Sequence, residues 1–384
     1  MLLTTARQRR LLAFLLLALF LIYWIPFSNA FPGWVPLQFS SYRIFQATTI
    51  AMWAIVALGL NILTGYNGQI SLGHGAFVAL GGYTSAILIF DHNWPFWATI
   101  PIAGLLTGAI GFLVGLPALR LTGPYLAIAT LALALSTPQI LQKYEGLTHG
   151  SQGINIDSPT PPGALNDILN DTQYLYFLAL LVAFIMAIVA WNIVRSRVGR
   201  AFVAIRDSEI AAQSMGVNLA IYKSIAFAYS AALMGLAGAL FAHKIAYLAP
   251  DIFNILLSIQ FLLLVIVGGL GSLHGAVFGA IFVALLPPLI AILRDSIPAS
   301  MNDAAVAMNI KLIAIIGEGI GNFLKKPGVE AGIFGLILVL VILLEPLGMY
   351  GRWVKIRVFF STFPMYRGAT FKRQKSYMRS ERLR

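Results

Sequence analysis

One polar segment decides the fold: Arg195-Ser-Arg-Val-Gly-Arg-Ala-Phe-Val-Ala-Ile-Arg-Asp-Ser-Glu-Ile-Ala-Ala-Gln-Ser-Met-Gly-Val-Asn-Leu-Ala-Ile-Tyr-Lys223. It carries five basic and two acidic residues, and Val203, Ile205 and Ile210 give it part of a helical apolar rhythm. Uncharged runs of bilayer-spanning length precede and follow it. A basic loop between two spans is expected on the cytoplasmic side. A short amphipathic helix in that loop suits docking on a soluble partner.

The composition is that of an integral membrane protein. Of the 384 residues, 59% are hydrophobic and 10% are charged, and the mean hydropathy is +0.83. A soluble domain of this size could not bury so much apolar surface, and the continuous apolar runs do not alternate as β-barrel strands do. We therefore predict an all-α, polytopic transmembrane helical bundle. The sequence has no cysteine, which excludes disulfides and thiol chemistry.

Ten apolar runs are expected to cross the membrane. They are Leu11–Ile25, Ile44–Thr64, Ile70–Phe90, Phe96–Leu119, Leu121–Gln142, Thr172–Val194, Ser224–Ala242, Ile252–Leu273, Gly275–Leu293 and Ala331–Leu344. About 20 helical residues cross the hydrocarbon core, so most runs suffice, while the first and last need flanking residues. The first run could instead be a cleaved signal peptide, because Ser28-Asn-Ala30 resembles a cleavage site.

The distribution of charge predicts the orientation. With the N-terminus inside and ten alternating spans, the inner segments hold 19 of the 26 Lys and Arg residues and the outer segments hold 7. This bias follows the positive-inside rule and puts both termini in the cytoplasm. The sequence then divides into a transmembrane domain, 1–350, with a cytoplasmic loop at 195–223, and a basic cytoplasmic tail, 351–384.

Three segments outside the spans have distinct compositions. The outer segment Lys143–Asp171 is rich in Gly and Pro and is expected to be an ordered loop rather than a helix. Apolar residues recur at helical spacing within 303–325, which predicts an amphipathic helix at the outer interface. The alternative, an eleventh span there, would bury Lys311 and Glu318. The tail mixes ten basic residues with aromatic ones, which favours anchoring on anionic lipid over binding nucleic acid.

The sequence lacks the motifs of several kinds of chemistry. Gly is never followed by Lys, so there is no phosphate-binding loop of the Gly-Lys-Ser/Thr type, and no metal-ligand motif occurs. The spans hold essentially no ionisable residues except His74 and His274, which disfavours an ion-coupled carrier. We expect no catalysis, no cofactor and no metal in this chain, and any ATP hydrolysis must come from another polypeptide.

Two glycine-rich patches stand out, at 59–83 and 268–276. Both contain His-Gly-Ala preceded by Ser and Leu, at His74 and His274. This echo is weak evidence for a parallel internal duplication. Such glycine density permits close helix packing, or broken helices whose free amides face a solute. On this basis we expect the residues facing a solute to be Asn61, Tyr66, Gln69, Ser71, His74 and Gln260.

The motifs in these segments resemble those of a known family. Leu58-Gly-Leu-Asn-Ile-Leu-Thr-Gly-Tyr66, Gly68-Gln-Ile-Ser-Leu-Gly-His-Gly-Ala-Phe77, Gly199–Val217, Gly235-Leu-Ala-Gly-Ala239 and Val267-Gly-Gly-Leu-Gly-Ser272 occur in the order seen in high-affinity branched-chain amino acid permeases. These permeases are membrane subunits of ATP-binding-cassette importers. The resemblance covers roughly Ile44 to Leu293 and is nearer to the longer, second permease of the pair.

The resemblance implies partners and a coupling site. It implies a bacterial inner-membrane importer with a second homologous permease, two cytoplasmic ATP-binding subunits and a periplasmic substrate-binding protein. Residues matching the family's Glu-Ala-Ala…Gly element are Glu209, Ala211, Ala212 and Gly216, and the charges of Arg200 and Arg206 can fix its register on the ATPase. The segment lacks the Leu-Pro that often ends the element, and Ile210 is inserted after Glu209.

Other functions remain open at this point. The solute could be a branched-chain amino acid or, as in related importers, urea or a short amide. A self-contained secondary carrier or channel is disfavoured by the missing intramembrane carboxylates and by the coupling-like loop. A membrane enzyme is disfavoured further, because the sequence shows no catalytic constellation.

Overall fold

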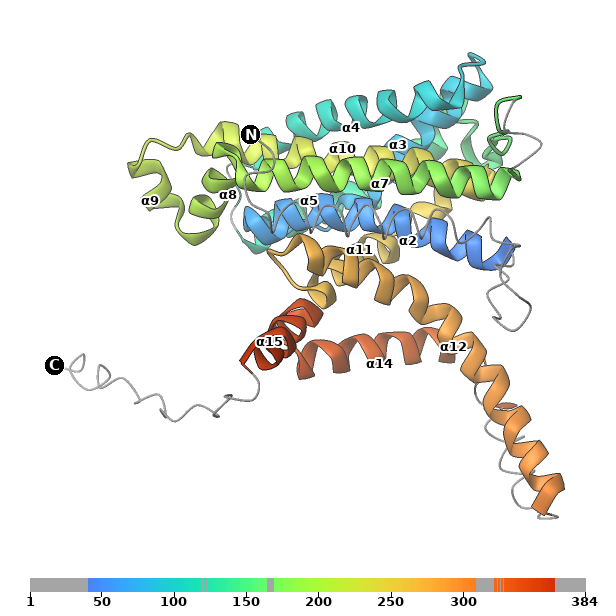
Figure 1. The fold of residues 1–384 in the computed structure, drawn as a ribbon. Helices are drawn as coiled ribbons and strands as arrows, with labels where there is room; N and C mark the ends of the chain where they lie inside the picture. Colours follow the sequence, from blue (N-terminus) through green and yellow to red (C-terminus); the bar gives the residue numbers. More distant parts are fainter. Residues whose placement is uncertain are drawn as a thin grey trace.

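The computed structural model describes residues 41–118, 121, 123–163, 169–308, 321, 322, 324, 326 and 328–362. Within these residues the chain is helical apart from turns and one small two-stranded ribbon. Figure 1 shows most of the long helices lying side by side along a common axis, while the helix at Leu273–Met308 runs obliquely away from them. The predicted all-α helical membrane protein is therefore confirmed.

Six helices carry segments that are long and apolar enough to cross a membrane in the described part of the chain. They are α2 (Ser41–Leu60), α4 (Phe96–Ala118), α5 (Pro124–Lys143), α7 (Asp171–Arg195), α10 (Leu219–Ile245) and α12 (Leu273–Met308). The first of them continues into a π-helical turn, η2 (Asn61–Tyr66). A seventh candidate is the pair α14 (Val329–Leu344) and α15 (Gly348–Thr362), which is bent by 46°.

Two helices are shorter than the sequence predicts. Runs at 70–90 and 252–273 suggest full spans, but α3 (His74–Phe90) has 17 residues and α11 (Ile255–Gly268) has 14. Before α3 the backbone turns at Gly68, with φ +77°, and after α11 it turns at Gly269, with φ +118°. A short 3-10 helix, η4 (Pro250–Phe253), also precedes α11. Glycine tolerates these φ values, so the glycine-rich patches end helices that apolar composition alone would extend.

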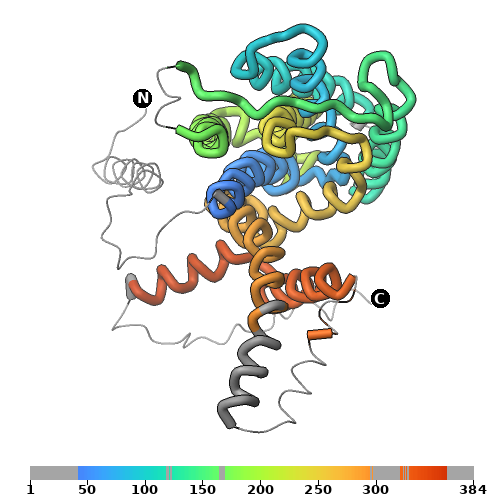
Figure 2. The backbone as a smooth tube through the Cα atoms, turned by 90° about the vertical axis from the view of Figure 1, so that its right-hand side faces the viewer, coloured from blue at the N-terminus to red at the C-terminus, as the bar shows by residue number. Residues whose placement is uncertain are grey.

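Helix α10 forms the centre of the bundle and packs on α2, α3 and α4. The face of α4 toward α10 is made of glycines at alternating intervals of four and three residues, Gly104, Gly108, Gly111 and Gly115. On α3, a Cβ placed on Gly81 would overlap the carbonyl oxygen of Gly235. Small residues let backbones approach this closely, which is how helices associate where lipid gives no hydrophobic drive. In Figure 2, which looks along the bundle, α12, α14 and α15 lie to one side of it.

Segments distant in sequence close one end of the bundle, opposite α8 (Arg197–Asp207) and α9 (Glu209–Ser214) (Figure 1). There β1 (Ile154–Asn155) pairs antiparallel with β2 (Tyr247–Leu248). Gln142 donates to Asp251 at 2.8 Å, and a short helix, α6 (Glu145–Thr148), is followed by the 3-10 turn η3 (Gly150–Gln152). The segment predicted to be an ordered loop is thus ordered where described, although it contains these helical turns.

Several predictions lie outside the described residues. They are the first span, the position of both termini, and most of the amphipathic helix near 303–325. The beginning of that last segment, 303–308, continues α12, the helix of the span predicted at 275–293, and does not start a separate helix. The tail at 351–384 is described as far as Thr362, and that part continues α15.

Close packing on α10 predicts that one added methyl group there is costly. A Cβ on Gly235 would lie 2.6 Å from the oxygens of Ala103 and Thr107. We expect Gly235→Ala to lower the stability of the purified chain in detergent by about 1–3 kcal/mol, seen as a lower midpoint of thermal unfolding. Gly335→Ala is the matched control, because no atom lies within 4 Å of a Cβ there. Equal midpoints for the two variants would contradict tight packing at α10.

Candidate functional site

The polar segment forms a hairpin of two short helices that protrudes from one end of the bundle (Figure 1). Each helix is capped by a serine. The Ser196 hydroxyl accepts hydrogen bonds from the amides of Val198 and Gly199, and the Ser208 hydroxyl accepts one from Ala211 at 3.2 Å. Serine at these positions satisfies amides that a helix start leaves free. The extended backbone at Ser208, with φ −164°, therefore separates α8 from α9.

One face of the hairpin is fixed to the bundle. Phe202, Ile205 and Ala212 are buried. Gly199 allows α8 to lie against the end of α7, because a Cβ on it would overlap the carbonyl oxygen of Val194. Ala212, which matches the family's Glu-Ala-Ala…Gly element, thus packs inside its own chain.

An ion pair between a buried lysine and an exposed glutamate ties α9 to α10. The Lys223 ammonium lies 2.7 Å from Glu209 Oε1, and the side chain of Lys223 is only 3% exposed while that of Glu209 is 43% exposed. A buried cation without a counter-charge is costly, so this pair holds the beginning of α9 against the bundle. Glu209 thus has a partner within the chain, a role that the sequence motif alone does not reveal.

The tip of the hairpin is apolar and exposed. Ile210 is 81% exposed and Met215 is 86% exposed, and Ala211 beside them is also exposed. Gly216 follows with φ +84°, a backbone conformation that favours glycine. A Cβ added to it would meet no atom within 4 Å, so no side chain covers the tip at this position. Exposed apolar side chains on a polar loop indicate a docking surface.

Sequence reasoning named Ala211 and Gly216 of this tip but missed Ile210 and Met215. Ile210 appears in the sequence as part of one apolar rhythm with Val203 and Ile205. The break at Ser208 turns it outward, while Ile205 stays buried. The Ile inserted after Glu209 was the sequence feature that could have indicated an exposed apolar residue. For Met215 the only such feature was its position in a polar segment.

Arg206 connects the hairpin to both glycine-rich patches. Its Nη1 donates to the carbonyl oxygen of Gly65 at 3.0 Å. A Cβ on Gly68 would lie 2.9 Å from Arg206 Cγ, and one on Gly271 would lie 3.3 Å from Nη1. The guanidinium therefore sits where the turn between α2 and α3 meets the turn between α11 and α12. Arg200, by contrast, is exposed and donates only to the carbonyl oxygen of Arg195, at 3.4 Å.

Asn61 joins these two turns. It is fully buried in η2, its Nδ2 donates to the carbonyl oxygen of Ser272 at 2.6 Å, and its Oδ1 accepts from the amide of Gly271 at 2.8 Å. We call Asn61, Gly65, Arg206 and Gly271 the inner junction. Both the Nδ2 and the Oδ1 of Asn61 are hydrogen-bonded here, so its side-chain amide links the turn between α2 and α3 to the turn between α11 and α12.

The other residues expected to face a solute are mostly bonded within the chain. Gln69, Ser71 and His74 are buried, and His74 Nε2 lies 2.8 Å from the Ser230 hydroxyl. Two of the amides near the helix break before α3 also have side-chain partners, since Leu72 donates to Thr130 and Gly75 to Ser258.

Tyr66 and Gln260 lie elsewhere. Tyr66 lines a cavity at the hairpin end, and Gln260 is partly exposed on α11. The structure thus brings Asn61 and Tyr66 to one turn with Gln69 just beyond it, and leaves Gln260 apart on another helix.

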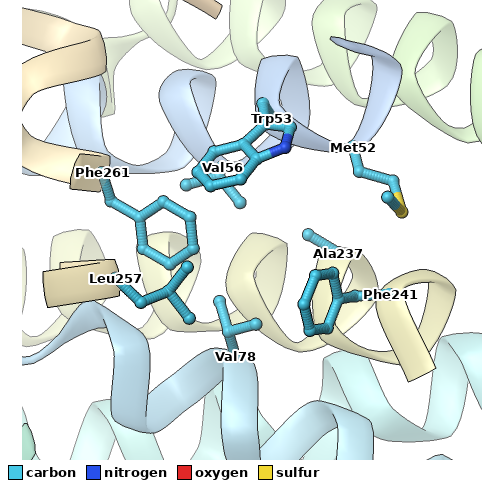
Figure 3. Close-up of a pocket in the computed structure, with 8 residues that line it drawn as sticks. All are labelled: Met52, Trp53, Val56, Val78, Ala237, Phe241, Leu257 and Phe261. Atoms are coloured by element: carbon cyan, nitrogen blue, oxygen red, sulfur yellow. The ribbon is translucent and has the colours of Figure 1, made fainter. Parts of the chain in front are cut away.

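A small apolar pocket lies between α2, α3, α10 and α11. It is lined by Met52, Trp53, Val56, Val78, Ala237, Phe241, Leu257 and Phe261. Figure 3 shows Trp53 and Phe261 next to each other in its wall, and their ring centroids are 5.0 Å apart in an edge-to-face arrangement. Its volume is about 20 Å³, room for about one water. Sequence reasoning missed this lining, because apolar residues in apolar spans carry no local signal.

Within the described ranges no group of three or more His, Asp or Glu side chains is placed to hold a metal ion. The site consists of an exposed docking tip, a polar junction at the helix turns, and an apolar pocket deeper in the bundle.

Comparison with known proteins identifies the family. A family model described as "Branched-chain amino acid transport system / permease component" matches residues 42–316. The chain belongs to this family of transport permease components. No solved structure matches it.

The similar proteins are permeases. The chain is 35% identical over 271 residues to the high-affinity branched-chain amino acid transport system permease protein LivM of Escherichia coli K12. The aligned region covers 65% of this chain and 64% of LivM. It is 23% identical over 261 residues to LivH of Salmonella typhimurium, covering 64% of this chain and 84% of LivH. The autoinducer 2 import system permease protein LsrC of Escherichia coli O9:H4 is 28% identical over 145 residues, or 36% of this chain and 41% of LsrC. The match therefore spans less than two thirds of the length of LivM.

The ion pair between α9 and α10 can be tested by a double-mutant cycle. Glu209→Gln leaves the ammonium of Lys223 buried without a counter-charge, so we expect amides of residues 209–216 to open more easily by about 1–3 kcal/mol in hydrogen exchange. Adding Lys223→Met should restore most of the loss, because no buried cation remains. Asp157→Asn is the control, since Asp157 is an exposed carboxylate outside the hairpin. A double variant as unstable as Glu209→Gln would show that the pair is not the cause.

Proposed function

We propose that this chain is the permease subunit of an ATP-binding-cassette importer of the bacterial inner membrane, moving branched-chain amino acids by alternating access. The observation that carries the proposal is the protruding hairpin, with its exposed tip at Ile210 and Met215 and its anchorage through Arg206. In a chain of this permease family, such a hairpin suits a surface that an ATPase grips.

The proposed assembly has five subunits. A second homologous permease, two cytoplasmic ATP-binding subunits and a periplasmic substrate-binding protein complete it. The resemblance of this chain to both LivM and LivH supports a pair of permeases. Nucleotide hydrolysis belongs to the ATP-binding subunits, so the chain itself is a transport subunit and not an enzyme.

The proposed topology has ten spans with both termini cytoplasmic. The hairpin end would be the cytoplasmic one, and an amphipathic helix near 303–325 would lie on the outer face. In support, Arg195, Arg197, Arg200, Arg206 and Lys223 gather at the hairpin end, whereas the carboxylates of Asp91, Glu145 and Asp251 lie at the opposite end. We assign 1–350 to the membrane domain and 351–384 to a tail resting on anionic lipid.

The inner junction supplies the mechanism of coupling. Closure of the ATPases would push on the bundle through the hairpin, because its buried face and the pair of Glu209 with Lys223 fix α8 and α9 to the ends of α7 and α10. Arg206 would pass that displacement to two turns at once. Those turns join the inner ends of α2, α3, α11 and α12, so the four helices would move together.

The apolar pocket supports an aliphatic solute. Three of the helices that meet at the inner junction, α2, α3 and α11, also line it, so motion there would change its size. Its lining suits the branched side chain of Leu, Ile or Val better than urea or a short amide, which need polar partners. At about 20 Å³ the pocket is smaller than such a side chain, so uptake requires α11 to move away from α2.

The function is tested by uptake into proteoliposomes. We expect the assembled complex, given binding protein and ATP inside, to accumulate leucine, and unlabelled isoleucine and valine to compete. The chain reconstituted alone should show no uptake. Uptake by the chain alone would establish a secondary carrier, and competition by urea or acetamide but not by valine would establish the amide alternative.

Two variants separate docking from transmission. Ile210→Asp should abolish co-purification of the ATPases, because a charge replaces an exposed apolar anchor. Leu147→Asp, which changes an exposed apolar residue at the opposite end, should not.

Arg206→Ala should leave the ATPases bound and hydrolysing ATP, yet lower uptake per ATP about tenfold or more. Arg197→Ala is its control. Normal uptake by Arg206→Ala would remove the inner junction from the mechanism.

A further inference from the structure

A second cavity lies beside the inner junction. It has a volume of about 290 Å³ and is bounded by the end of α7, the turn at 271–274 and the beginning of α15. Its walls are largely aromatic. The rings of Trp191 and His274 are 5.8 Å apart and perpendicular, and His274 stacks on Tyr350 with centroids 6.0 Å apart. The cavity is large enough for a ligand group of several atoms.

The cavity carries positive charge. Arg195 lines it, with its guanidinium carbon 4.0 Å from the centroid of the Trp191 ring. Neither Asp nor Glu is among the lining residues, and within the described ranges Arg195 has no carboxylate in ion-pair distance. Helix α12 begins at Leu273 in the cavity wall, which adds the positive end of a helix dipole. These features favour an anion with a planar or tetrahedral array of oxygens.

Two apolar stripes lead from this cavity along the bundle. On α7, Leu181, Ile185 and Ile188 are exposed at spacings of four and three residues and continue to Trp191. On α12 the same spacing occurs in Ile281, Leu285, Leu289 and Ile292, which are also exposed. Stripes of this length suit acyl chains, and a cation with aromatic rings at their end suits a headgroup.

We propose that this cavity binds the phosphate of an anionic phospholipid, with Arg195 as its partner and the acyl chains along α7 and α12. The site is separate from the docking tip and from the apolar pocket. It lies against Tyr66 and Gly271, so a bound lipid would brace the turns that meet at the inner junction. The proposal rests on the cavity and its charge and does not depend on the transported solute.

Native mass spectrometry of the full-length chain, purified in its membrane assembly and stripped of lipid, tests the site. We expect titration with phosphatidylglycerol to yield one tightly bound lipid, and diacylglycerol, which has no phosphate, to yield none. Inorganic phosphate should not displace the lipid at equal concentration. Displacement by inorganic phosphate would identify free phosphate as the ligand and overturn the assignment to lipid.

Matched variants locate the lipid. Arg195→Gln should weaken its binding about tenfold, as expected for loss of one charge-assisted hydrogen bond. Arg197→Gln removes the same charge two residues away, from a side chain that does not line the cavity, and should bind like the parent. Val194→Trp keeps Arg195 but fills the cavity, and it should also lose the lipid. Equal binding by all variants, or equal loss in Arg197→Gln, would overturn the proposal.

Discussion

The contact of α10 with α3 and α4, backbone against backbone, is the constraint on which the rest of the structure depends. In lipid an apolar side chain gains nothing by meeting another helix, so association depends on how closely the backbones can approach. Glycines of α4 and the meeting of Gly81 with Gly235 allow that approach. Because α10 begins directly after the hairpin, its fixed position also fixes where α8 and α9 emerge.

Polar groups are few in this bundle, and the structure concentrates many of them where helices break. At the inner junction an asparagine and an arginine take up backbone groups that the turns leave free. An unpaired backbone amide or carbonyl is expensive in a low-dielectric surrounding, so these side chains stabilise non-helical turns within an apolar protein. The same contacts link the hairpin to four helix ends. In the proposed mechanism, stability and coupling would therefore share one set of hydrogen bonds.

The residues of the hairpin show how far sequence reasoning reached. Its existence, its place between α7 and α10 and its basic charge follow from the pattern of apolar runs, and its family motif follows from Gly199–Val217. The direction of each side chain does not follow from that pattern. Ser208 interrupts the helix, so that Ile210 is exposed while Ala212 is buried. Likewise, the sequence marks Asn61 and His74 as unusual polar residues in apolar runs. Only their partners, Ser272 and Ser230, reveal that they hold the fold together.

By itself the sequence determined the class of protein, the order of its apolar segments and the segment that protrudes, because each depends on composition over a stretch of about 20 residues. The tertiary structure alone decided where α3 and α11 stop, which glycines serve packing and which serve turns, and which helices share a pocket. Those features depend on contacts between residues such as Asn61 and Gly271, 210 positions apart in the chain. A local sequence pattern cannot predict such contacts, because they form only when distant turns are brought to the same end of the bundle.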